Sequence, residues 1–168
     1  EMPLTIVRSL VNDVILVDES TIEEAIALLI EIEKTVTEGA GATGVAALLQ
    51  HRARFAGRNV GIVLCGGNID SRILASILMR NLVREGRLVR IRVRLPDVAG
   101  ALAKLTKVVG DAGANVVDVE HQRLFGVFSV KSTEVELTLE TRDRSHVTQL
   151  LAELELHGFV ANLLGVAD

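Results

Sequence analysis

This sequence has no tryptophan or tyrosine, four phenylalanines, two prolines and a single cysteine. One cysteine allows neither a disulfide within the chain nor a thiolate metal cluster. With aromatic residues at 2% and a formal net charge of -4, the sequence disfavours nucleic-acid binding through basic patches and base stacking. No apolar run reaches transmembrane length, and no signal peptide is visible. We therefore expect a cytoplasmic protein that binds neither nucleic acid nor membrane.

The 168 residues are 49% hydrophobic and 24% charged, which is enough to form one ordinary domain or two small ones. The residue pattern changes near residue 86, so we predict two segments, 1–86 and 87–168. The chain begins with Glu1 rather than methionine, and we expect it to be part of a longer protein.

The first segment is rich in helix formers. We expect short strands at residues 14–17 and 59–64, the second of them covered on both faces. Ser20 is the expected N-cap of a helix, with Glu23 completing a capping box, and further helices are expected over residues 39–50 and 73–83. Because two parallel strands cannot bury both faces of each, this segment reads as part of a larger α/β domain.

The second segment alternates apolar and polar residues in four runs. These runs, at residues 88–95, 115–123, around 135–139 and at 159–164, predict strands, with helices at residues 101–112 and 143–157 between them. The order is βαββαβ, which is typical of the ferredoxin-like α+β fold.

One short run is the most informative in the chain: Cys65, Gly66, Gly67 and Asn68 follow the apolar residues 60–64. Small residues at the carboxyl end of a strand let a ligand approach the backbone. Cys65 would lie at that edge. The alternative is that Cys65 is only a small buried apolar residue, as most lone cysteines are.

With the upstream run that starts at Glu38, this motif resembles the threonine dehydratases (threonine ammonia-lyases) and their serine-racemase-like relatives. These are pyridoxal-phosphate enzymes of fold type II. The resemblance implies that Cys65 hydrogen-bonds the ring nitrogen of pyridoxal 5'-phosphate, with Gly66, Gly67 and Asn68 beside the ring. Glu38 matches an acidic residue near the ring. Its alternative role is that of a carboxylate favoured at a helix N-terminus.

The same family requires a lysine that forms a Schiff base with the cofactor. The lysines of this chain are Lys34, Lys104, Lys107 and Lys131, and none stands in the family's sequence context. The family's glycine-rich phosphate loop is also absent. The resemblance therefore implies a C-terminal fragment that carries no catalytic residue and is inactive by itself.

The second segment contains Leu95, Pro96, Asp97, Val98, Ala99 and Gly100, followed later by Gly113, Ala114 and Asn115. This pattern resembles the ACT domain, a regulatory module that commonly binds amino acids. Backbone N–H groups at Ala99 and Gly100 would attract a carboxylate, because they open a helix. Asp97 would cap the helix or attract an amino group. The alternative is an ordinary strand-to-helix turn.

The ACT resemblance also implies self-association, as a dimer or a higher oligomer, through exposed sheet edges. The effector would lie between the loop at residues 95–100 of one copy and the strand after Asn115 of its neighbour.

The remaining charged groups give weaker signals. The histidines lack spaced partners, so no metal site is predicted. His121 faces either the regulatory site or a dimer contact, or it is simply exposed. The arginines of residues 88–95 lie on one strand face, which we interpret as a solvated face opposed by Glu134 and Glu136.

Taken together, these resemblances predict part of a lyase that converts L-threonine (or serine) to a 2-oxo acid, 2-oxobutanoate from threonine, and ammonia. They predict allosteric regulation by an isoleucine- or valine-type amino acid, as in isoleucine biosynthesis. Two alternatives stay open. One is a stand-alone amino-acid-sensing ACT protein with a vestigial enzyme tail, and the other is a serine-racemase-like enzyme.

Overall fold

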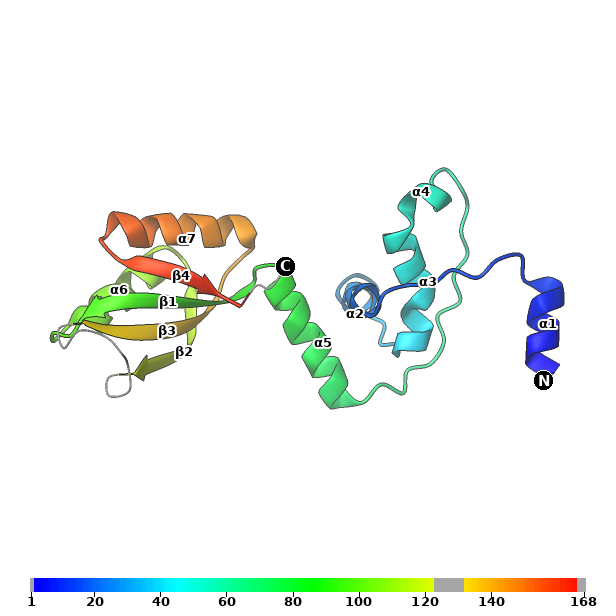
Figure 1. Cartoon of the computed structure of the whole chain (residues 1–168), viewed down its shortest axis with the longest axis horizontal. Helices are drawn as coiled ribbons and strands as arrows, with labels where there is room; N and C mark the ends of the chain where they lie inside the picture. The colour runs from blue at the N-terminus through cyan, green and yellow to red at the C-terminus, as the bar shows by residue number, and fades with distance from the viewer. Residues whose placement is uncertain (1, 123–131, 166–168) are drawn as a thin grey trace. The chain divides into compact units, whose positions relative to one another are not determined.

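The computed structural model describes residues 2–122 and 132–165 (Figure 1). The chain divides into two compact units, Glu1–Leu78 and Met79–Asp168, and each is described by itself. The division falls inside a helix, whereas the domain boundary predicted from the sequence follows residue 86. That boundary stays a prediction.

The first unit is helical in the residues described. Its elements are α1 (Met2–Leu10), α2 (Glu19–Leu28), a π-helical turn η1 (Leu29–Glu33), α3 (Gly39–Gln50), α4 (Arg52–Phe55) and the first half of α5 (Ser71–Arg84). The helices α2, α3 and α5 contribute a small apolar core that includes Ile26, Ala42 and Ile77. The helices predicted at residues 39–50 and 73–83 are confirmed.

The predicted N-cap of α2 is wrong. The helix begins at Glu19, and Asp18 rather than Ser20 is the N-cap, with its carbonyl accepting from the N–H groups of Thr21 and Ile22. The side chain of Gln50 fixes Asp18 by donating to its carboxylate at 2.9 Å and accepting from its backbone N–H at 2.9 Å. This contact joins residues far apart in the sequence, so no local pattern could indicate it.

The two strands predicted in the first unit are also wrong. Residues 14–17 and 59–64 have no regular secondary structure, and Leu16 and Val63 are 84% and 83% exposed. A strand needs a hydrogen-bonded neighbour. Within the described residues of this unit, neither segment has one.

The second unit has the predicted order. Its elements are β1 (Leu88–Pro96), α6 (Ala101–Asp111), β2 (Asn115–Gln122), β3 (Ser132–Glu140), α7 (Arg144–Leu156) and β4 (Val160–Leu164). They form an antiparallel sheet in the order β2-β3-β1-β4, with β1 at its centre between β3 and β4. The βαββαβ prediction is confirmed; residue 123, the predicted end of the second strand, lies outside the described residues.

Alternation along the strands separates the two faces of this sheet. Val89, Ile91, Val93 and Leu95 are buried under α6 and α7, where they meet residues such as Leu105. Burial of one such side chain stabilises the fold by about 1.5–3 kcal/mol, so the apolar face holds both helices to the sheet. The opposite face carries the arginines of β1.

Candidate functional site

The predicted cofactor motif forms a turn that packs against the start of α3. The backbone N–H of Glu38 donates to the carbonyl of Gly66 at 2.9 Å. The hydroxyl of Thr37 lies 2.9 Å from the same oxygen and 3.2 Å from the carbonyl oxygen of Cys65. The structure therefore brings Glu38 together with Cys65 and Gly66, which lie far from it in the sequence.

Two glycines make this close packing possible. A Cβ atom on Gly41 would lie 1.8 Å from the carbonyl oxygen of Cys65, which no real side chain tolerates. Gly66 has φ +74°, and a Cβ atom there would lie 2.2 Å from Oε1 of Glu38. A residue larger than glycine at position 41 would push the turn away from α3, and one at position 66 would be strained and would displace the Glu38 carboxylate.

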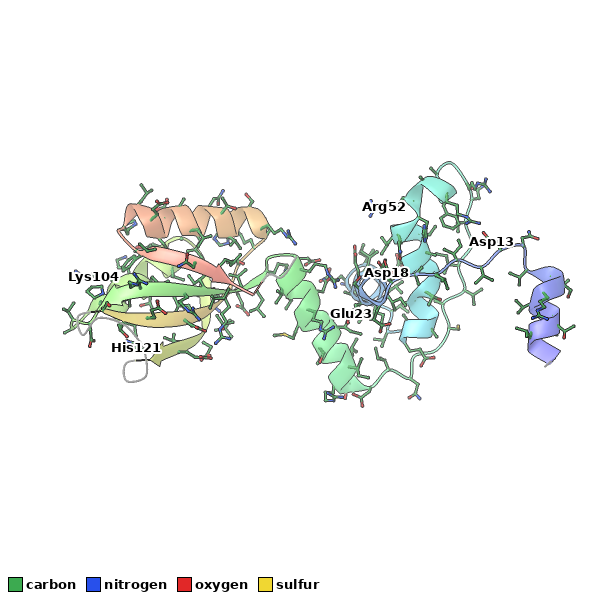
Figure 2. The ribbon with its side chains drawn as sticks, viewed as in Figure 1. Asp13, Asp18, Glu23, Arg52, Lys104 and His121 are labelled. Atoms are coloured by element: carbon green, nitrogen blue, oxygen red, sulfur yellow. The ribbon has the colours of Figure 1, made fainter. Side chains whose placement is uncertain are left out.

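The other predicted cofactor residues lie along the same segment. Cys65 is exposed, so its thiol is accessible, in contrast to the buried apolar residue of the alternative interpretation. Gly67 follows Gly66 in the turn, and a Cβ atom there would meet the carbonyl of Val36 at 3.5 Å. Asn68 and Glu38 line a pocket of about 370 Å³, together with the acidic side chains of Glu19 and Glu23 on α2. Glu23 is labelled in Figure 2.

Helix α3 gives Glu38 a defined electrostatic setting. Glu38 is its N-cap residue, but its side chain makes no capping hydrogen bond and instead lies against Gly66. The positive end of the helix dipole favours a carboxylate there. Both interpretations of Glu38 therefore stay compatible with its position.

The exposed thiol of Cys65 is compatible with a contact to the ring edge of pyridoxal phosphate, whereas none of the chain's lysines stands in the sequence context of the family's Schiff-base lysine. Of the described lysines, Lys34 donates to the carbonyl of Glu31 at 2.7 Å and Lys107 pairs with Asp111 at 2.7 Å. Lys104 belongs to the second unit, and Lys131 lies outside the described residues.

The second candidate site is a pocket of about 510 Å³ at the β1–α6 connection. Gly100, with φ +82°, turns the chain into α6. The lining is mainly small and apolar, with a few polar groups: Leu95, Pro96, Asp97, Val98, Ala99, Gly100, Ala101, Leu102, Ala103, Thr106, His121 and Thr133. All of the loop residues predicted to bind an effector are therefore in one place.

Asn115 does not line this pocket. It stands opposite Glu140 in the sheet and donates to that carboxylate at 2.9 Å, whereas Leu95 pairs with Thr133 near the other end of β3. Asn115 is thus at the end of β2 away from the loop. The far end of β2 supplies His121 instead (Figure 2). The predicted contact with Asn115's strand in a neighbouring copy stays a prediction.

The arginine face of the sheet is a charged ladder, as predicted. Arg90 and Arg92 each reach a Glu136 oxygen at 2.7 Å, and Arg90 also pairs with Glu120 at 2.9 Å. The hydrogen bonds that the Arg92 guanidinium donates to Glu136 raise the pKa of Arg92 above its ordinary value. The arginines of these pairs are about half exposed, so each pair contributes little stability by itself.

Among the described residues, no group of histidine, cysteine and carboxylate side chains is arranged to hold a metal ion. The same residues include no helix that is both long and apolar enough to cross a lipid bilayer. His146 is buried and structural: its Nδ1 accepts from the Arg142 N–H at 3.1 Å, and its Nε2 lies 2.9 Å from the carbonyl of Ala112.

Sequence reasoning missed Thr37, Thr106 and Thr133. Thr37 stands directly before the Glu38 motif, and that adjacency is the one signal that could have singled it out. Thr106 follows the loop by about one and a half helical turns, and Thr133 reaches the pocket only through strand pairing with Leu95.

The model for the ACT domain family matches residues 84–156, which include the β1–α6 pocket. Residues 84–156 form an ACT domain. The match agrees with the loop motif and with the βαββαβ order of the second unit.

Over nearly its whole length, the chain is similar to L-threonine ammonia-lyases. It is 38% identical to the enzyme of Geobacter sulfurreducens over 95% of this chain and 40% of that protein. It is 37% identical to the enzyme of Thermotoga maritima over 98% of this chain and 41% of that protein. A serine racemase of Arabidopsis thaliana is 43% identical over 39% of this chain and 21% of that protein.

The resemblance to threonine dehydratases is therefore confirmed, with an ACT domain in the second unit. The chain spans about two fifths of the length of the ammonia-lyases that it matches.

Proposed function

We propose that this chain is the C-terminal part of a pyridoxal-phosphate-dependent threonine ammonia-lyase. Residues 1–86 contribute to the cofactor-binding domain, and the ACT domain binds an amino-acid effector. The observation that carries the proposal is the turn at Cys65 and Gly66, held against Glu38 in a chain with ammonia-lyase relatives along nearly all of its length. The ammonia-lyase relatives match both units, whereas the serine racemase matches less than half of the chain.

Pyridoxal phosphate, when bound, supplies the electron sink that lets threonine lose its β-hydroxyl group. The thiol of Cys65 would lie at the ring nitrogen, where an uncharged partner would leave the ring a weaker electron sink than a carboxylate partner would. This setting favours prompt loss of the hydroxyl over racemisation. Gly66 and Gly67 let the turn pack closely against Glu38 and the carbonyl of Val36, and the Glu38 side chain lies beside the turn at the start of α3.

The Schiff-base lysine and the phosphate loop come from residues outside this chain. We therefore expect the isolated chain to be inactive. Several large apolar side chains of the first unit are exposed, among them Leu10, Leu16 and Val63 at 76%, 84% and 83%. Contact with further protein would bury this apolar surface, which supports a larger catalytic domain around the first unit.

The test uses the full-length polypeptide that contains this chain, purified with added pyridoxal phosphate. The proposal predicts a visible absorption band from the lysine-bound cofactor and release of 2-oxobutanoate and ammonia from L-threonine. Conversion of L-serine mainly to D-serine would instead support the serine-racemase-like alternative. A protein with no band and no turnover would leave the stand-alone ACT sensor.

The effector site is the pocket at the β1–α6 connection. The start of α6 attracts a carboxylate, because the first N–H groups of a helix carry partial positive charge. The apolar lining, with Leu95, Val98 and Leu102, suits an aliphatic side chain. An amino acid of the isoleucine or valine type combines both features, and we propose it as the effector.

The ACT domain also provides the self-association of the parent protein. The pocket opens beside His121 at the end of β2, and β2 is an edge strand of the sheet. Val117 and Val119 on this edge are 53% and 38% exposed. Pairing of two copies along β2 would cover these side chains and bring a neighbour's strand beside the effector loop.

A further inference from the structure

Thr37 is a buried polar residue at the centre of the cofactor turn. It is 2% exposed, and its Oγ1 lies 2.9 Å from the carbonyl oxygen of Gly66, 3.2 Å from that of Cys65 and 3.3 Å from that of Glu38. A hydroxyl carries a single proton. It therefore donates to one of these oxygens at a time, and the shortest distance favours Gly66.

The hydroxyl is one of the two donors that hold the Gly66 carbonyl, the other being the backbone N–H of Glu38. The Cys65 carbonyl also faces α3, with Gly41 packed against it. With its backbone held against α3, Cys65 keeps an exposed side chain. The orientation of the thiol therefore depends on contacts made by the carbonyls and not by the sulfur.

We propose that Thr37 is a positioning residue for the cofactor ring: its hydroxyl fixes the turn at Cys65 and Gly66, and so fixes where the thiol of Cys65 meets the ring nitrogen. This inference rests on the proposed function. It adds a residue that touches neither the cofactor nor the substrate and acts only through the backbone of the turn.

The proposed positioning of the turn depends on the hydroxyl group of Thr37 and not only on the size of its side chain. Valine has the size of threonine but cannot donate, so Thr37→Val leaves the carbonyls of Glu38, Cys65 and Gly66 with one donor fewer. Thr37→Ser keeps the donor and loses only a methyl group. Thr43 offers a matched control, because it is exposed on α3 and its hydroxyl donates to the carbonyl of Ala40 at 2.8 Å.

The experiment uses the full-length holoenzyme with pyridoxal 5'-phosphate as the probe. We expect Thr37→Val to shift the visible absorption band of the bound cofactor. We also expect it to raise the dissociation constant of the cofactor about three- to tenfold, the effect of one lost hydrogen bond. Thr37→Ser restores the band and the affinity. Thr43→Val changes neither.

A double-mutant cycle with Cys65→Ala separates positioning from general stabilisation. If Thr37 acts through the thiol, Thr37→Val in the Cys65→Ala background no longer shifts the band. The inference is overturned if Thr37→Val lowers only the unfolding temperature and leaves the band unchanged. It is also overturned if the shift is equal in both backgrounds.

Failure of the proposed function gives a different result. A wild-type protein that shows no cofactor band and no turnover refutes the lyase proposal, and the positioning role falls with it. A wild-type protein with normal band and turnover, but with no effect of Thr37→Val, refutes the positioning role alone.

Discussion

The guanidinium of Arg144 donates two hydrogen bonds to the carbonyl oxygen of Arg84, at 3.0 and 2.8 Å. Arg84 is the last residue of α5, where helix carbonyls lack partners within the helix, and Arg144 is the first residue of α7. Thr141 adds hydrogen bonds to the carbonyls of Gly86 and Arg87. These hydrogen bonds link the C-terminal end of α5 to the rest of the ACT domain.

Arg144→Met removes both hydrogen bonds to Arg84. Because the arginine is largely exposed, we expect the free energy of unfolding of the ACT domain to fall by only about 1 kcal/mol. Urea denaturation followed by circular dichroism measures the change. Arg142→Met is the matched control at a neighbouring exposed position. An equal loss in both variants would show that the contact with Arg84 has no special role.

Gly86→Ala tests how closely Gly86, which lies between α5 and β1, approaches Arg144. Gly86 has φ +70°, and a Cβ atom there would lie 2.8 Å from Cγ and 2.9 Å from the backbone nitrogen of Arg144. Gly158 has φ +80° and nothing within 4 Å of the same position. Both substitutions add about 1–2 kcal/mol of backbone strain, and only Gly86→Ala adds a clash, so its urea midpoint falls further. Equal midpoints would contradict the close approach.

Ala103→Glu tests the effector pocket. Ala103 is exposed in the first turn of α6 and lines the pocket. A carboxylate there repels the carboxylate of an amino acid, while the helix N-terminus tolerates it. We expect isoleucine or valine to raise the unfolding temperature of the wild type and not that of Ala103→Glu. Ala152→Glu on α7 should keep the wild-type response; if it loses that response too, the pocket assignment is wrong.

Val117→Lys tests the association edge. Val117 lies on β2, and Val160, which is 68% exposed, lies on the opposite edge strand β4. Lysine on an edge strand discourages pairing between copies. We expect Val117→Lys to reduce the molar mass measured by light scattering, and Val160→Lys to leave it unchanged. The opposite pattern would place the contact on β4.

The ACT domain could be predicted from the sequence because its elements are local. Strand alternation, the helix that starts after Gly100 and the helix predicted over residues 143–157 each depend on neighbouring residues, and each is present. The first unit was less predictable. Apolar runs such as residues 59–64 indicate strands only where a partner strand exists, and the described residues of that unit provide none.

The two candidate sites differ in the same way: one is formed by neighbouring residues and the other by residues far apart in the sequence. The loop residues Leu95 to Gly100 follow one another in the chain, so their shared pocket was predictable. Thr37 and Gly41 reach Cys65 across more than twenty residues, through packing that no periodicity records.

One measurement tests the central claim most directly: release of 2-oxobutanoate from L-threonine by the full-length protein, with and without isoleucine or valine, in the wild type and in Ala103→Glu. The account predicts turnover in both proteins, and a rate that changes with the effector only in the wild type. Absence of turnover in the presence of pyridoxal phosphate would contradict the lyase. Turnover that is insensitive to every common amino acid would contradict the regulatory role of the ACT domain.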